Sequence, residues 1–108
     1  MQNYLLLMSG GGRPQNENER KSVLKDWDVW MAKLGKDLVD GGNPFTPQVK
    51  SISSDGKVSD GPIGGMASGY CIIKAESLAI AVTLAKGCPV LKTGAKITVY
   101  ETFDASGM

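Results

Sequence analysis

Two short stretches of the chain are apolar at every position, and each of them predicts a buried strand. They are residues 4–8 and residues 70–73. A strand with one face in water alternates between apolar and polar residues, whereas a strand covered on both faces is apolar throughout. We therefore expect these two strands in the middle of a sheet that is covered on both sides.

The longest periodic segment predicts a helix over residues 17–34. Its apolar residues recur at the spacing of an α-helix, and Asn16 followed by Glu19 is typical of a helix start, although Asn18 is a second capping candidate. Gly35 stands where such a helix ends. The apolar side of this helix carries both tryptophans, which we assign to the core, Trp27 and Trp30.

A second, shorter helix is predicted after residues 70–73. It begins near Glu76 or Ser77 and closes at Gly87 and Pro89. Four residues at helical spacing form its apolar stripe, namely Leu78, Ala81, Val82 and Ala85.

Short strands and turns fill the segment between the two helices. Residues 37–54 are expected to contain one or two short strands: residues 37–40 lead into a turn-rich break, and residues 48–53 alternate. Residues 55–56 are Asp-Gly, the dipeptide favoured in a tight hairpin turn. Val58 begins the return strand, which ends at the break over residues 60–62.

A last alternating strand over residues 96–103 completes the order strand–helix–strand–strand–helix–strand. This order gives an antiparallel sheet with both helices on one face, an α+β fold of the ferredoxin-like βαββαβ type. Two helices cover only that face, yet the central strands are apolar on both sides. A second copy of the sheet, related by twofold symmetry, is the simplest cover for the other face, so we expect a homodimer.

Length and composition limit the classes of function. At 108 residues the chain is expected to form one domain over residues 1–108. Its formal net charge is +1 and is spread evenly, so we expect no basic surface for nucleic acid. The apolar run at residues 4–8 is too short for a signal peptide or a membrane span, and we expect a cytoplasmic protein without membrane contact.

Two residue types bear on catalysis and on metal binding. The chain contains no histidine, which excludes a mechanism that uses an imidazole of this chain. Cys71 and Cys88 form no CxxC motif and have no other soft ligands beside them in the sequence. We interpret both as buried free thiols of a reduced compartment, and we expect neither a metal nor a cofactor.

Several segments, in order along the chain, resemble the YCII-related (DGPF) family. They are Trp27-x-x-Trp30, Asp60-Gly61-Pro62, Gly69-Tyr70 at the start of a strand, and Ala-Lys-Gly-Cys-Pro over residues 85–89. The resemblance covers nearly the whole chain and implies a dimeric α+β barrel built from two ferredoxin-like subunits. Relatives of this type are often associated with extracytoplasmic-function sigma factors, which implies an accessory or regulatory role beside a sigma-factor-type partner.

The chain departs from that family in two respects. The loop motif often continues with Phe, whereas here Ile63 follows Pro62. Some YCII-like relatives resemble enzymes that use a histidine–aspartate pair, and this mechanism cannot be transferred to a chain without histidine.

Asp60-Gly61-Pro62 is the first candidate site, and it has two interpretations. In the structural one, the Asp60 carboxylate caps a turn, Gly61 supplies unusual dihedral angles and Pro62 ends the ladder. In the functional one, Asp60 stands at the rim of the sheet beside a pocket, where it acts as a general base or holds a polar ligand group. Gly61 and Pro62 belong to the same predicted ligand-binding loop.

The stretch Gly10-Gly11-Gly12-Arg13 is the second candidate. It is either a flexible connector, or an anion site made by backbone amides, Arg13 and the N-terminus of the first helix. The spacing of a phosphate-binding loop, GxxxxGK[ST], is absent. Asn43 and Tyr70 are expected to add hydrogen bonds to the same cavity.

The element order is also that of an RNA-recognition module, with Tyr4 and Tyr70 as its stacking residues. The required basic and aromatic positions are occupied by Ser68, Ile72 and Ala75 instead, so we reject nucleic acid as a partner. Two hypotheses of function remain. The first is a dimeric accessory protein that binds a small ligand or a protein partner. The second is a small cofactor-free enzyme for an anionic or aromatic substrate, with Asp60 as acid or base beside Arg13 or Tyr70.

Overall fold

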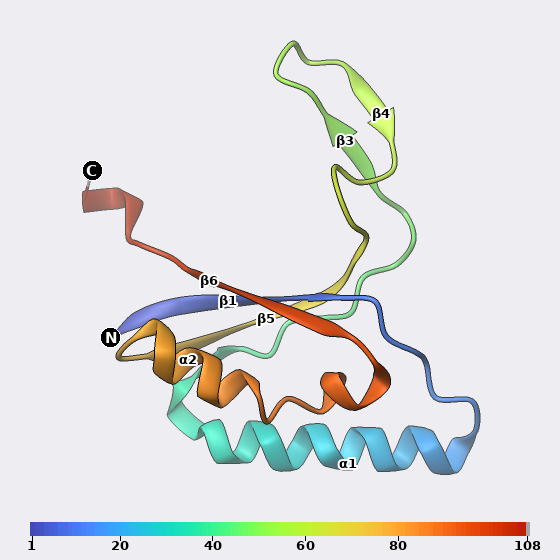
Figure 1. Cartoon of the computed structure of the whole chain (residues 1–108), viewed down its shortest axis with the longest axis vertical. Coiled ribbons are helices and arrows are strands. Elements are labelled where there is room, and N and C mark those ends of the chain that lie inside the picture. Colours follow the sequence, from blue (N-terminus) through green and yellow to red (C-terminus); the bar gives the residue numbers. More distant parts are fainter. Residues whose placement is uncertain (108) are drawn as a thin grey trace.

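The protein has a four-stranded antiparallel sheet with two helices on one face (Figure 1). The computed structural model describes residues 1–107. The strands lie in the order β2-β5-β1-β6, and every neighbouring pair is antiparallel. The elements of this ferredoxin-like βαββαβ body are β1 (Gln2–Ser9), α1 (Glu17–Leu34), β2 (Leu38–Asp40), β5 (Ala67–Ala75), α2 (Leu78–Ala85) and β6 (Lys96–Glu101). The α+β fold class predicted from the sequence is therefore confirmed.

A separate hairpin stands away from this body (Figure 1). It consists of β3 (Lys50–Ile52) and β4 (Val58–Asp60), which pair with each other and form a sheet of their own. The turn comes at the predicted Asp-Gly dipeptide, where Gly56 has φ +89° and Asp55 accepts a hydrogen bond from the Lys57 amide. We call residues 47–66 the arm.

The first helix begins and ends where its sequence signals predict. The Asn16 side chain accepts a hydrogen bond of 2.8 Å from the Glu19 amide, and the Glu19 carboxylate accepts one of 2.7 Å from the Gln15 amide. Gly35 ends the helix with φ +54°, a value that favours glycine, and its amide donates to the Met31 carbonyl.

The second helix is capped by Ser77, whose hydroxyl accepts a hydrogen bond of 3.2 Å from the Ile80 amide. Its predicted apolar stripe is only half right. Ala81 and Ala85 are buried, but Leu78 and Val82 are exposed. The strand after it also stops early, because β6 ends at Glu101 and Phe103 lies beyond the sheet.

The core lies between the sheet and the helices. Every second residue of β1 and β5 is buried there, and α1 contributes Trp30 and Leu34. The Trp30 indole nitrogen donates a hydrogen bond of 3.1 Å to the Leu84 carbonyl, which ties α1 to the end of α2. Trp27 packs against this core from its edge and is half-buried. Among residues 1–107, no helix is both long enough and apolar enough to cross a membrane.

Candidate functional site

Among residues 1–107, no helix covers the second face of the sheet, whose central side chains are only half-buried. Strand residues directly opposite one another project to the same side. Leu5 pairs with Ile72 on one side and with Tyr100 on the other, and Leu7 pairs with Tyr70. These residues face away from the helices, and we call them the open face: Leu5, Leu7, Tyr70, Ile72 and Tyr100.

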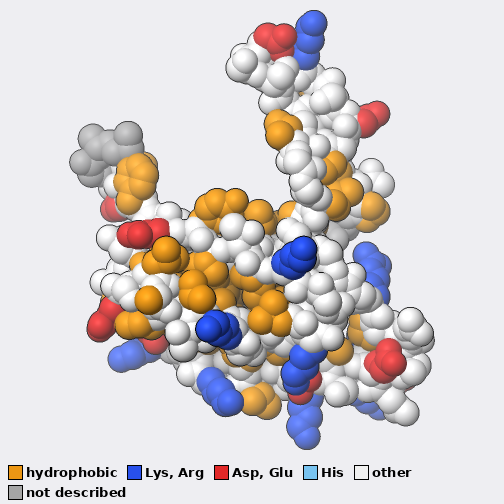
Figure 2. Space-filling view, viewed as in Figure 1, with side chains coloured by type: hydrophobic (Ala, Val, Ile, Leu, Met, Phe, Trp, Pro, Cys, Tyr) orange, Lys and Arg blue, Asp and Glu red, His pale blue; other side chains and the backbone are white. Residues whose placement is uncertain are grey.

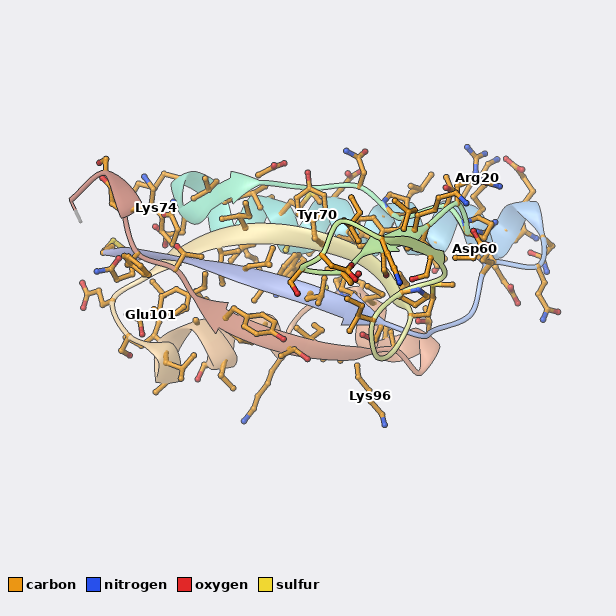
Figure 3. The ribbon with its side chains drawn as sticks, turned by 90° about the horizontal axis from the view of Figure 1, so that it is seen from above. Arg20, Asp60, Tyr70, Lys74, Lys96 and Glu101 are labelled. Carbon is orange, nitrogen blue, oxygen red and sulfur yellow. The ribbon has the colours of Figure 1, made fainter. Side chains whose placement is uncertain are left out.

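Polar residues frame the open face at both ends of the strands. Asn3 pairs with Lys74 at one end, and Ser9 pairs with Lys96 at the other. Figure 3 looks onto this side of the sheet, with Tyr70 near its middle and Lys74 and Lys96 toward opposite ends. An apolar centre within a polar frame is the usual composition of a protein interface.

Tyr70 is the best-supported of the predicted site residues, because two other side chains meet it. The ring of Phe45 stacks on the ring of Tyr70, with centroids 5.9 Å apart and an interplanar angle of 25°. The Tyr70 hydroxyl lies 3.4 Å from Oδ2 of Asp40 and donates to it. An aromatic plane and a carboxylate thus stand together at one edge of the open face.

The chain path after β2 places these partners beside Tyr70. Pro44 forms a bridge with Gly69, and the Phe45 amide donates to the Ser68 carbonyl at 2.8 Å. Gly42 passes so close to β5 that a Cβ there would lie 1.7 Å from the Tyr70 carbonyl oxygen. Its φ of +68° also favours glycine.

Asn43 lies in this segment, next to Gly42, and is exposed. The predicted pair of Asn43 and Tyr70 is therefore brought together along the edge of β5. Asp40 and Phe45 were missed from the sequence, since no motif marks them and their role depends on the course of residues 41–45.

Asp60 is far less enclosed than predicted. It is the last residue of β4 on the arm rather than a residue at the rim of the four-stranded sheet. Its side chain is 90% exposed and forms an ion pair with Lys50 across the hairpin. The interpretation of Asp60 as a turn cap is wrong, because this ion pair takes the place of a bond to turn amides.

The two residues after Asp60 do have structural roles. Gly61 adopts φ +84°, as predicted for an unusual dihedral angle, and its carbonyl accepts a hydrogen bond of 2.7 Å from the Ser51 hydroxyl. Pro62 follows the end of β4 and is exposed. An open cleft of about 510 Å³ lies at the base of the arm, lined by Asp60 and Gly61 together with Lys50 and Met66.

Arg13 lies apart from both groups. It lines a shallow cleft of about 260 Å³ with Glu19, Ser22 and Thr93. The nearby start of α1 already carries Glu17 and Glu19 in its first turn, and these carboxylates compensate the positive end of the helix dipole. This arrangement favours the connector interpretation over the anion site, and Gly10 and Gly11 indeed have φ of +75° and +95°.

Tyr4 cannot serve as a stacking residue. It is 1% exposed and lies on the helix-covered face, opposite in direction to Leu5. The RNA-recognition arrangement therefore lacks one of its two predicted aromatic positions, in agreement with its rejection from the sequence.

Both cysteines are buried and free, as predicted. Removal from water raises the pKa of the Cys71 thiol to about 12, with smaller contributions from Cys88 and Asp40. Burial likewise raises the pKa of Cys88 to about 11. Both thiols are protonated at neutral pH, and a protonated thiol is a poor nucleophile and metal ligand.

Comparison with solved structures shows the fold. Nine chains of known structure match this one. One of them is 5-chloro-2-hydroxyhydroquinone dehydrochlorinase from Burkholderia phenoliruptrix AC1100, solved in complex with 2,5-dihydroxybenzoquinone. The match has a TM-score of 0.57 and 17% sequence identity, and it covers 97% of each chain. No protein-family model matches the sequence, and no curated protein matches it in a sequence search.

Proposed function

We propose that this chain is one subunit of a homodimer that binds a small aromatic ligand between two facing sheets. The assembly is the dimeric α+β barrel of the YCII-related (DGPF) type, with residues 1–108 as one domain. A single observation carries the proposal: the two central strands expose apolar side chains on the face that the helices leave bare.

The open face favours a second copy of itself as its cover. Its centre contains aliphatic and tyrosine side chains, whereas charged residues occur at its ends. A contiguous apolar patch rimmed by polar residues marks an interaction site, and twofold packing buries the same patch on both partners. Tyr70 and Tyr100 stand on opposite flanks of the face, so two copies bring four tyrosines to the space between the sheets.

The cluster at Tyr70 indicates the class of ligand. Phe45 already stacks on Tyr70, so a second flat ring can extend the stack over the open face. The Asp40 carboxylate, within 3.4 Å of the Tyr70 hydroxyl, can accept a hydrogen bond from a ligand hydroxyl. A phenol or a related aromatic with hydroxyl groups suits this combination. Asn43, Asp60, Gly61, Pro62 and Arg13 remain further predicted ligand-binding residues.

The proposed role is accessory or regulatory rather than catalytic. It is supported by the lack of histidine, and by two cysteines whose thiols stay protonated. The sigma-factor-type partner rests on the family resemblance alone, and a cytoplasmic location is proposed with it.

Two measurements test the proposal. Sedimentation velocity at micromolar concentration should give a dimer, and a stable monomer would refute the assembly. A thermal-shift screen of phenols, aromatic acids, aliphatic carboxylates and phosphates should then find stabilisation by hydroxylated aromatics. A ligand at 100 times its Kd stabilises by about 2.7 kcal/mol.

Tyr70→Phe and Tyr100→Phe form a matched pair for this screen. Both keep the ring, but only Tyr70 has its hydroxyl on a carboxylate. We expect Tyr70→Phe to weaken binding of a hydroxylated aromatic by up to about tenfold, because the Asp40 carboxylate that accepts the ligand hydroxyl loses the Tyr70 hydroxyl that holds it in place. Tyr100→Phe should weaken ligand binding less. Equal effects of the two changes would refute the proposal that the Tyr70–Asp40 pair binds the ligand.

The alternative is a cofactor-free enzyme that acts on an aromatic or anionic substrate. The fold similarity to a dehydrochlorinase of a chlorinated hydroquinone supports it. The Tyr70–Asp40 pair is better placed than Asp60 to move a proton, because Asp40 stands beside the Tyr70 hydroxyl at the edge of the open face, whereas Asp60 is paired with Lys50 on the arm. Turnover of a hydroxylated chloroaromatic that Asp40→Asn abolishes and Asp60→Asn retains would favour this alternative.

A further inference from the structure

The arm carries an apolar pair for which its own chain offers no cover. Ile52 and Val58 are directly opposite each other in the hairpin register and are 68% and 60% exposed. The side-chain hydrogen bonds of the strands in the arm, such as Ser51 to Gly61 and Lys50 to Asp60, stay within the arm. An isolated two-stranded hairpin is at best marginally stable in water, so this arm needs a surface to pack on.

The dimensions of the chain agree with an extension that does not pack on its own body. The radius of gyration is 15.5 Å, whereas a compact domain of this length has about 13 Å. The longest axis measures 46 Å against 18 Å for the shortest.

The solvent-accessible surface of the chain is larger than that of a compact monomer of the same mass. It is 7725 Å², and a compact monomer of 11.4 kDa exposes about 5,800 Å². The excess of about 1,900 Å² is well above the roughly 800 Å² that each partner buries in a standard interface.

The arm and the open face lie on the same side of the molecule. Figure 1 shows the arm rising from the sheet on the side opposite to the helices. Figure 2 shows hydrophobic side chains along the arm as well as on the body. A partner that covers the open face therefore comes to stand beside the arm.

We propose that the arm of each subunit packs against the body of the other subunit and buries Ile52 and Val58 there. This inference rests on the homodimer of the proposed function. The occupant is a second copy of this chain because the excess surface is of the size that a large dimer interface buries. The arm also has no net charge to attract nucleic acid or an anionic membrane: Lys50 pairs with Asp60, and Asp55 stands two residues from Lys57.

An arm that crosses to the partner makes the ligand cavity a product of both chains. The cleft at the base of the arm adjoins Lys50 and Asp60. In the dimer, these two residues belong to a wall that one subunit supplies next to the sheet of the other.

Photo-cross-linking tests the crossing directly. Ile52→Cys introduces a thiol that is exposed in the separate chain, whereas both native cysteines are buried with raised pKa values, so a benzophenone maleimide added to the dilute, dissociated chain should label position 52 alone. Chains that carry benzophenone and natural ¹⁴N are mixed with an excess of ¹⁵N chains that carry no benzophenone. The mixture is then irradiated and digested. We expect the cross-linked peptides to join ¹⁴N to ¹⁵N chains. Cross-links confined to one chain of a dimer would overturn the inference.

A pair of double variants measures how much the two arm residues contribute to dimer affinity. Ile52→Thr with Val58→Thr keeps strand-forming side chains but removes the apolar surface. Leu24→Gln with Val29→Gln removes similarly exposed apolar residues, 52% and 49%, from α1 and keeps helix-forming side chains. We expect the dimer dissociation constant to rise at least tenfold in the arm variant and less than twofold in the control.

The outcomes separate this inference from the proposed function. If the arm variant dimerises with unchanged affinity while Leu7→Lys on the open face dissociates the dimer, the facing sheets are retained and the crossing arm is refuted. A monomeric wild-type protein refutes both. A dimer weakened by both changes supports both.

Discussion

The two faces of the four-stranded sheet are made of alternating residues of the same strands, yet only one of them is enclosed. Tyr4, Leu6 and Met8 of β1 are buried beneath the helices, whereas Leu5 and Leu7 between them are half-buried. The side chains on the two faces are similarly apolar. What differs is the cover: α1 and α2 supply it on one side, and the chain supplies nothing equivalent on the other.

This difference separates two kinds of stability. A residue on the helix-covered face contributes to folding of the single chain. A residue on the open face contributes to stability mainly when a second surface buries it, because the hydrophobic effect depends on the apolar area removed from water. Leu6 and Leu7 in β1 therefore allow a direct test, since they lie in the same strand and have the same type of side chain but point to opposite faces.

Leu6→Ala should have the largest effect on folding. Leu6 is fully buried among the core residues, and such a truncation costs about 2–5 kcal/mol, from lost burial and the cavity left behind. Urea unfolding monitored by tryptophan fluorescence at a fixed protein concentration gives the change. A loss below about 1 kcal/mol would mean that the helix-covered face is less tightly packed than its burial indicates.

Leu7→Lys should act on assembly instead. Leu7 lies at the centre of the open face between Tyr70 and Thr98, and a lysine there brings an ammonium group into the proposed interface. We expect the dimer dissociation constant to rise at least 100-fold, with the circular dichroism spectrum of the resulting monomer unchanged. Lys96→Ala, at the polar end of the same face, is the control and should shift it less than about fivefold.

Local signals explain why so much of the fold could be predicted. The bounds of α1 follow from Asn16, Glu19 and Gly35, which act within one turn of the helix ends, and the hairpin turn follows from Asp55 and Gly56. The uncovered face of the sheet also follows from the sequence, because strands that are apolar on both sides require two covers.

The errors come from long-range packing. The stripe of α2 predicts burial for Leu78 and Val82, but the helix packs on the body through Ala81, Leu84 and Ala85 instead. The candidate site depends on residues 41–45 running along the edge of β5, which brings Phe45 and Asp40 to Tyr70. No local pattern encodes that course. Asp60 lies on the arm rather than at the rim of the four-stranded sheet, because its loop motif does not reveal that the hairpin leaves the sheet.

Alkaline pH should destabilise the helix-covered face selectively. The pKa of Cys71 is raised to about 12 and that of Cys88 to about 11, above the ordinary value of 9.0. Above pH 9 the unfolded chain releases thiol protons that the folded chain retains, so the free energy of unfolding falls with rising pH. The contribution is complete below pH 9 and is lost as pH rises through the folded pKa values. Burial, and to a lesser degree Glu101, also raises the pKa of Tyr4 above 10.0, and this adds to the fall at higher pH.

Urea unfolding at pH 8, 9 and 10 tests this dependence. Cys71→Ala should flatten the slope, even though it also lowers stability at pH 8. A slope that does not change between the two proteins would show that the thiol does not stay protonated in the folded state.

Asp60→Asn should have the smallest effect, because Asp60 belongs to neither face. Its carboxylate is nearly fully exposed, and exposed ion pairs contribute about 0–1 kcal/mol. We expect the free energy of unfolding to stay within about 1 kcal/mol of the wild type. Because Asp60 stands only in the outer wall of the proposed cavity, Asp60→Asn should reduce aromatic ligand affinity less than Asp40→Asn, which removes the charged acceptor beside Tyr70. If Asp60→Asn instead abolished ligand binding while the dimer persisted, the site would lie at the base of the arm, and the open face would serve assembly alone.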